Sequence, residues 1–290
     1  MRYVIALGGN ALTKAELLNS VSAKVVALAR KGNEIIITHG NGPQVGKLAM
    51  HEKRSLALLT RETQEQIGAE VKKSLLAAAK RQGKVDVEVV FTHVFVDKND
   101  KEFANPTKPI GSFYKEGKAR SMMKKGFAIK HLLEGYRRVV PSPKPKAIEE
   151  LARIEHMAEK RGSIIIAGGG GGIAIIKKAK GFEYANAVID KDLTSALLAI
   201  KFKADRFLIL TNVDGAYLNF ETKKEKKLRR VKVKELQKYI KSGQFEAGSM
   251  LPKIRACIEF VKKTKMPAVI AHLEKADKAF ELKGATVIVP

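Results

Sequence analysis

The sequence predicts an α/β protein with a mainly parallel sheet, because short apolar runs alternate with helical segments along its 290 residues. Four runs rich in β-branched residues each lead into a glycine-rich or polar turn, at 3–7, 34–38, 163–167 and 207–210. Parallel strands that are buried on both faces have this composition. Between the runs, apolar residues recur every three or four positions, as they do on amphipathic helices.

In the N-terminal half, the first strand ends at Gly8-Gly9-Asn10, and a helix follows it. Thr13-Lys14-Ala15-Glu16 has the form of a capping box, and apolar residues continue one face as far as Leu28. The second strand leads into His39-Gly40-Asn41-Gly42. A helix over 63–79 and a strand over 87–96 are predicted next.

The segment from 97 to 136 breaks the alternation of strands and helices. It is rich in lysine, glycine and proline, and it lacks the apolar periodicity of the flanking segments. We therefore expect an inserted lobe, of about residues 97–137, that forms a lid over the core.

The C-terminal half returns to the alternating pattern. Five glycines, Gly168 to Gly172, follow the strand at 163–167, and 173–176 forms another apolar run. A helix over 193–200 has Asp192 near its start, and a second helix begins near Pro252 with an apolar stripe to Val261. Two runs, 268–271 and 285–289, are predicted to close the sheet.

Ligands of open α/β sheets bind beyond the carboxyl ends of the strands. Four turns in this position predict one crevice, and the bare backbone of glycine lets N–H groups approach an anion closely. The sequence therefore indicates a phosphorylated ligand. Three lysines stand out by context: Lys108 lies between two prolines, while Lys191 and Lys253 lie at predicted helix starts.

Composition excludes several classes of protein. The single cysteine, Cys257, excludes an internal disulfide and lies on an apolar stripe, so we expect a core thiol. No apolar run reaches the roughly 20 residues that span a bilayer, and no signal peptide is evident, so we expect no membrane partner and a cytoplasmic location. No P-loop motif and no cluster with metal-ligand spacing is present, so we expect no dedicated protein metal site.

The formal charge of +25 comes from 55 basic and 30 acidic residues. Three explanations of this net charge are possible: a solvated lysine-rich surface, attraction of anionic nucleotides, or nucleic-acid binding. The basic residues are spread along the chain with few aromatic residues between them. This pattern favours the solvated surface, and we do not expect a nucleic-acid site.

Taken together, the motifs resemble those of carbamate kinases, a branch of the amino-acid kinase family. The resemblance spans nearly the whole chain, and its motifs are 6–12, 38–46, 96–100, 105–111, 137–143, 168–172, 188–193, 248–253 and 271–274. It implies a three-layer αβα sandwich around an open, mostly parallel eight-stranded sheet in a single domain. The substrate lobe would span about 1–205 and the nucleotide lobe about 206–290, with the lid inserted in the former.

The resemblance also implies an activity: reversible phosphoryl transfer between ATP and carbamate, giving ADP and carbamoyl phosphate. Mg²⁺ would arrive with the nucleotide, no organic cofactor would be needed, and the chain would form a homodimer. Other branches of the family carry a lysine where this chain has Ala6. Lys108, on the lid, is expected to supply that cation.

The resemblance assigns roles to named residues. The catalytic group would be Lys108, Lys191, Lys253 and Asp192, with Asp192 orienting the lysines. Gly8, Gly9 and Asn10 would bind the transferring phosphate, and Gly40, Asn41, Gly42, Gly169 and Gly170 the substrate. Thr211, Asn212, Val213, Asp214, Met250 and Lys253 would hold the nucleotide.

Two alternatives stay open at this point. One is another kinase of the same fold, acting on a different small acid or a phosphorylated substrate. The other is a catalytically silent basic protein that binds nucleotides or nucleic acid, which steep salt-dependent binding to duplex DNA would reveal.

Overall fold

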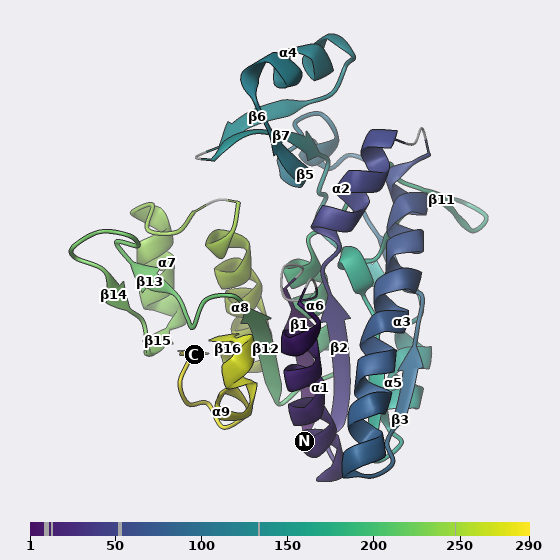
Figure 1. The fold of residues 1–290 in the computed structure, drawn as a ribbon, viewed down its shortest axis with the longest axis vertical. Helices are drawn as coiled ribbons and strands as arrows, with labels where there is room; N and C mark the ends of the chain where they lie inside the picture. Colours follow the sequence, from purple (N-terminus) through teal and green to yellow (C-terminus); the bar gives the residue numbers. More distant parts are fainter. Residues whose placement is uncertain (9–11, 13, 52–53, 133, 247) are drawn as a thin grey trace.

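The structure is a computed structural model that describes residues 1–8, 12, 14–51, 54–132, 134–246 and 248–290. Within these residues the main sheet has eight strands (Figure 1). Their spatial order is β15 (Arg230–Lys232), β17 (Thr286–Val289), β16 (Ala268–His272), β12 (Arg206–Thr211), β1 (Arg2–Leu7), β2 (Glu34–His39), β9 (Ser163–Ile166) and β3 (Asp86–Val89). The strands from β16 to β3 pair in parallel, whereas β17 is antiparallel to β16. The predicted fold class is confirmed.

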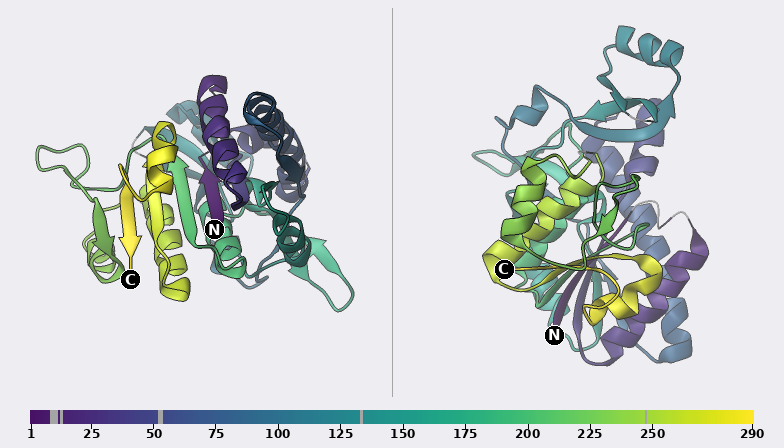
Figure 2. Two further views of the ribbon diagram at one scale, coloured as in Figure 1. Left: turned by 90° about the horizontal axis from the view of Figure 1, so that it is seen from below. Right: turned by 90° about the vertical axis from the view of Figure 1, so that its left-hand side faces the viewer.

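Helices cover both faces of this sheet, which gives the three layers seen in Figure 2. One face carries α1 (Ala15–Arg30), α3 (Leu56–Gln82) and α9 (Ala276–Phe280). The other carries α5 (Leu151–Ala158), α6 (Lys191–Lys201), α7 (Val233–Lys241) and α8 (Met250–Thr264).

Side chains along β1 point alternately to the two faces of the sheet, so this strand contributes to both hydrophobic cores. Ile5 and Leu7 pack with α1 and α3, while Val4 and Ala6 pack toward α6 and α8. All four are at most 1% exposed. A strand with apolar residues on both faces can only be accommodated between two helical layers.

The inserted lobe has its own small sheet. Its strands are β5 (Lys108–Tyr114), β7 (Gly135–Val140) and β6 (Ile129–Leu132), and α4 (Glu116–Lys124) packs on them. Figure 1 shows this lobe at the top of the molecule, above α2 (Gly42–His51). Val45 of α2 and Ile110 of β5 share a buried cluster, so the lobe is attached to the core through α2.

A second, four-stranded sheet lies beside the main one. It contains β11 (Phe182–Tyr184), β10 (Ile173–Lys177), β4 (His93–Phe95) and β8 (Ala147–Ile148). Two short strands, β13 (Tyr217–Leu218) and β14 (Lys226–Lys227), form a hairpin. Single 3₁₀ turns occur at η2 (Lys101–Phe103), η3 (Gly169–Gly171) and η4 (Leu273–Lys275).

Two local predictions were wrong. The strand over 87–96 is two strands, β3 and β4, in different sheets, because the Gln64 amide binds both backbone groups of Thr92 and interrupts the ladder. The cap of α1 is Lys14, with no side-chain hydrogen bond to the helix, and Thr13 lies outside the described residues. The predicted helix over 63–79 is real but begins earlier, at Leu56.

Within the described residues, no helix is long and apolar enough to cross a bilayer.

Candidate active site

The carboxyl ends of the central strands meet at the start of α6. Gly8 directly follows β1, and its N–H donates to Leu210 O of β12 at 2.8 Å. Gly40 directly follows β2, and its N–H donates to Leu7 O at 3.1 Å. Gly9 and Asn10, the other predicted phosphate-binding residues, lie outside the described residues. The edge of the sheet thus brings the predicted glycine turns of β1 and β2 together.

Asp192 holds two of the three predicted lysines. Its Oδ1 lies 2.5 Å from Lys191 Nζ, and its Oδ2 lies 2.9 Å from Lys253 Nζ. The Asp192 side chain is only 3% exposed. One carboxylate therefore fixes ammonium groups from α6 and α8, which are separated by about 60 residues in sequence.

Burial and mutual attraction together set the pKa values of Asp192, Lys191 and Lys253. Burial alone would raise the pKa of Asp192, but the ammonium groups of Lys191 and Lys253 outweigh it and hold the pKa well below its usual range. Burial lowers the pKa of Lys191 in spite of Asp192. Burial also acts to lower the pKa of Lys253, but the charge of Asp192 outweighs it and the pKa is raised. The two lysines differ because burial dominates at Lys191 and attraction dominates at Lys253.

Lys108 reaches the same helix start from the inserted lobe. Its Nζ lies 2.8 Å from Asp190 Oδ2, and both side chains are about one-fifth exposed. The other oxygen, Asp190 Oδ1, accepts the N–H of Asp192 at 2.9 Å and so caps α6. No role was predicted for Asp190. Its position directly before a helix is the signal that identifies it as the cap.

The charge of Lys108 reinforces this arrangement. Burial would raise the pKa of Asp190, but Lys108 outweighs burial and lowers it, so the carboxylate stays ionised. Lys108, Lys191 and Lys253 therefore all contact carboxylates within the three-residue segment Asp190-Lys191-Asp192. Three cations gathered at the carboxyl end of a parallel sheet are suited to stabilising a multiply charged anion.

The glycine run packs tightly against the turn that follows β2. A Cβ on Gly169 would lie 2.4 Å from His39 Nε2, and one on Gly170 would lie 2.3 Å from Asn41 Nδ2. Gly170 also has φ +63°. These two predicted substrate-binding residues therefore contact the His39 and Asn41 side chains directly, and no larger residue fits there. A Cβ on Gly42, by contrast, would meet no atom within 4 Å.

His39 and Asn41 are held in place by their neighbours. Burial lowers the pKa of His39 to about 4, so its ring is neutral near pH 7. Asn41 Nδ2 donates to Thr63 Oγ1 at 2.8 Å, and Thr63 in turn donates to the backbone of α3. Sequence analysis missed Thr63, because the pairing of a loop with a helix 22 residues away leaves no local pattern.

A second buried network fixes the start of α6. Thr38 Oγ1 lies 2.6 Å from Ser195 Oγ, and Ser195 donates to Lys191 O at 2.5 Å. Thr194 Oγ1 donates to Gly171 O at 2.7 Å. All three hydroxyl-bearing side chains are fully buried, so strand β2 and the glycine run position the helix that carries Lys191.

The predicted nucleotide residues form a turn after β12. Thr211 is buried at its start, Asn212 is exposed, and Val213 is partly exposed. Asp214 Oδ1 accepts the Tyr217 hydroxyl at 2.5 Å, and Oδ2 lies 2.6 Å from Lys227 Nζ. Met250 begins α8, the helix that also carries Lys253. The pairing of Asp214 with Tyr217 and Lys227 was not predicted.

The pKa values of Asp214 and Tyr217 are strongly shifted. Burial would raise the pKa of Asp214, but hydrogen bonds from Lys227 and Tyr217 lower it to about 2. The same hydrogen bond raises the pKa of Tyr217 to about 12. The phenol therefore stays protonated and donates to Asp214, which stiffens the turn.

Two further observations bear on the chemistry. Among the described residues, no group of three or more His, Cys, Asp and Glu side chains is arranged to hold a metal ion. Cys257 is fully buried beneath the site, and burial raises its pKa well above the usual value, so it has no thiolate character.

Residues 1–272 match the family described as the amino acid kinase family. A carbamate kinase of Pyrococcus horikoshii is 43% identical over 312 residues, covering 100% of this chain and 99% of the relative. Carbamate kinase 2 of Staphylococcus epidermidis is 42% identical, covering 99% of each chain. The structure of Giardia lamblia carbamate kinase bound to AMP-PNP is 32% identical with a TM-score of 0.87, covering 99% of this chain and 98% of that one.

Proposed function

This chain belongs to the amino acid kinase family, and from this premise we propose that it is a carbamate kinase. It transfers the terminal phosphoryl group of ATP to a carbamate oxygen, forming that O–P bond and breaking the bond to ADP. The reverse reaction makes ATP from ADP and carbamoyl phosphate. The relatives named above carry this activity in their names over the full length of the chain.

One observation of the structure carries the proposal. Three ammonium groups lie on Asp190 and Asp192 at the carboxyl end of the sheet, with the glycine turns of β1 and β2 beside them. Phosphoryl transfer needs its reactants in line and its equatorial oxygens surrounded by positive charge. This site supplies the charge from Lys108, Lys191 and Lys253.

Within this proposal the residues have the following roles. Lys191 and Lys253 neutralise charge on the transferring group and the leaving oxygen, and Asp192 keeps both ammonium groups in place. Gly8, Gly9 and Asn10 bind the phosphoryl group. Each such charge donor contributes a factor of about 10²–10³ when it is held in place before the reaction.

Lys108 supplies the third charge from the inserted lobe. Ala6, at the position where other branches of the family carry a lysine, is buried in β1 and offers no cation. We assign the lid role to the lobe of about 97–137, the substrate side to about 1–205 and the nucleotide side to about 206–290. Lys108 can then leave Asp190 for the phosphoryl group when substrates are bound.

The substrate and nucleotide occupy opposite sides of this cluster. Carbamate lies against Gly40, Asn41 and Gly42, below Gly169 and Gly170. The nucleotide lies along the turn from Thr211 to Asp214 and against Met250. Mg²⁺ would arrive with the nucleotide, held by its phosphates, and would supply further positive charge. The reaction takes place in the cytoplasm, where its nucleotides are.

We further propose that the chain forms a homodimer through the outer edge of the four-stranded sheet. Phe182 and Tyr184 of β11, the edge strand of this sheet, are 39% and 43% exposed. The segment at β11 projects from the body of the molecule in Figure 1. Exposed aromatic side chains of this kind are enriched at protein interfaces. Sedimentation of the purified chain at twice its mass of 31.9 kDa supports the dimer, and a monomer contradicts it.

The activity has a direct test. Purified protein mixed with ADP, Mg²⁺ and carbamoyl phosphate should produce ATP, measured by coupled luminescence. A panel of acetyl phosphate, N-acetylglutamyl phosphate and isopentenyl diphosphate separates it from other kinases of the fold. Preference for one of these, or no turnover by protein that is folded by circular dichroism, would reject the proposal.

A further inference from the structure

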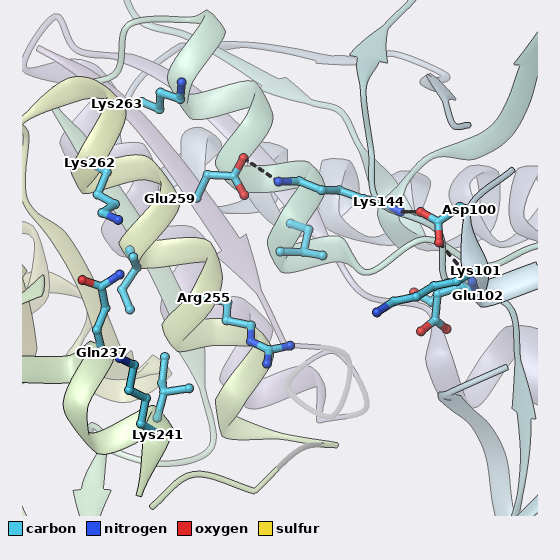
Figure 3. Close-up of a pocket in the computed structure, with 14 residues that line it drawn as sticks. Asp100, Lys101, Glu102, Lys144, Gln237, Lys241, Arg255, Glu259, Lys262 and Lys263 are labelled. Carbon is cyan, nitrogen blue, oxygen red and sulfur yellow. Dashed lines mark hydrogen bonds and ion pairs between the residues drawn. The ribbon is translucent and has the colours of Figure 1, made fainter. Parts of the chain in front are cut away.

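A groove of about 700 Å³ lies outside the reaction centre. One wall is formed by α7 and α8, and the other by the turn Asp100–Glu102 with Ser142 and Lys144 (Figure 3). Its volume is in the range of small-molecule sites. None of Lys108, Lys191 and Lys253 lines it.

The groove has more positive than negative charge. Its six cations are Lys101, Lys144, Lys241, Arg255, Lys262 and Lys263. Its three acids are Asp100, Glu102 and Glu259. The positions of these acids decide which cations are directly paired and which remain available to a ligand.

The acids are already engaged. Asp100 accepts the backbone N–H groups of Glu102 at 3.0 Å and Lys144 at 2.9 Å. Glu102 accepts the Thr107 hydroxyl at 2.7 Å, and Glu259 pairs with Lys144 Nζ at 3.1 Å. Figure 3 shows this last pair reaching across the groove.

The other five cations are not engaged. The side chains of Lys101, Lys241, Arg255, Lys262 and Lys263 form no ion pair or hydrogen bond with any residue that the structure describes. In Figure 3 the Arg255 guanidinium points into the space between α8 and the Lys101–Glu102 turn. The groove therefore presents five cations that have no direct carboxylate partner, and its cations outnumber its acids six to three.

The groove also has an apolar part. Leu193 of α6, Ile240 of α7 and Ile258 of α8 line it together with the charged side chains. Apolar surface and cations in one groove suit a ligand with an apolar body and several negative charges. Inorganic ions alone would leave this apolar surface uncovered.

We propose that the groove binds a small organic anion with two or more phosphate or carboxylate groups on an apolar body. Such a ligand contacts α7 and α8 on one side and the turn Asp100–Glu102 with Lys144 on the other. It therefore reinforces the link that Lys144 and Glu259 make across the groove. The site is separate from the one that holds ATP and carbamate under the proposed function.

The test uses 1,3,6,8-pyrenetetrasulfonate, a flat aromatic probe with four negative charges, and the full chain with saturating ADP and Mg²⁺ filling the reaction centre. Fluorescence anisotropy should report one saturable site per chain. The double variant Arg255→Glu with Lys262→Glu should weaken binding by at least about tenfold. A milder pair, Arg255→Gln with Lys262→Gln, should weaken it in the same direction.

The matched control is Lys223→Glu with Lys278→Glu. Both lysines are exposed, neither lines the groove, and the pair changes the net charge by the same amount. Binding should stay within about twofold in this control. Equal weakening in both pairs would show general attraction to a basic protein, and unchanged binding in the groove variants would place the probe elsewhere; either result overturns the proposal. ATP formation from carbamoyl phosphate is measured separately, so its failure leaves the binding result intact.

Discussion

Lys191 and Lys253 depend on one carboxylate for their positions, so each is expected to matter far more than an ordinary surface lysine. Replacing Lys253 by alanine removes an ammonium group that Asp192 holds at 2.9 Å. We expect kcat to fall by about 10²–10³-fold, as when one fixed charge donor is lost. Steady-state ATP formation measures this. Lys201→Ala, at the exposed end of α6, is the control and should stay within about twofold of the unchanged chain. Near-normal turnover in Lys253→Ala would contradict the role.

Burial gives Lys191 a lowered pKa, and this predicts how activity depends on pH. As pH rises through that pKa, the ammonium group loses its proton and the site loses one positive charge. We expect kcat to decline at a pH below the ordinary lysine value of 10.5. Lys191→Arg keeps its charge to much higher pH, because guanidinium pKa values exceed 12. Its kcat should be lower, but its alkaline decline should move upward. An unchanged alkaline decline in this variant would assign the titration to another group.

At the scale of elements, the inserted lobe is joined to the core where α2 crosses β5. A Cβ on Gly46 of α2 would lie 1.9 Å from the backbone N of Gly111, which itself has φ +71°. Gly46→Ala should therefore push β5, and with it Lys108, away from α2. We expect a loss of about 1–3 kcal/mol in the free energy of unfolding, as for other overpacked sites, and a fall in kcat.

Chemical denaturation and ATP formation measure the two effects of Gly46→Ala. The control is Gly117→Ala in α4 of the same lobe, where a Cβ would meet no atom within 4 Å. Alanine favours helix over glycine, so this control should be neutral or slightly stabilising. Equal stability and activity in Gly46→Ala and Gly117→Ala would show that the crossing does not position the lobe.

The sequence predicted the elements whose signals are local. The strands at 3–7, 34–38 and 207–210 and the stripes of α6 and α8 appear in the structure where periodicity placed them. The division of 87–96 into β3 and β4 was not predicted, because it depends on Gln64 from another element. The Lys108–Asp190 pair likewise joins residues 82 apart, and no local pattern encodes it. Motif resemblance identified three of the site's lysines, but only the folded arrangement shows which carboxylate holds each one.

At the scale of the whole molecule, the formal charge of +25 acts on stability and on ligand capture in opposite directions. Like charges on the surface repel one another and destabilise the compact state, whereas the same charges attract ADP and carbamoyl phosphate. Salt screens both effects, since the Debye length falls from about 30 Å at 0.01 M to about 8 Å at 0.15 M. Raising NaCl should therefore raise the unfolding temperature and lower kcat/KM.

The two responses can be measured on one preparation, by differential scanning calorimetry and by initial rates at low ADP. Lys223→Glu with Lys278→Glu lowers the net charge from +25 to +21 without touching the reaction centre. In this variant the unfolding temperature and kcat/KM should both change less steeply with salt, because less charge remains to be screened. A shallower kcat/KM slope in the variant indicates steering, because a purely local effect would change the variant's rate equally at every salt concentration and leave the slope unaltered. A kcat/KM that is independent of salt would mean that the basic surface is solvated charge with no part in substrate capture.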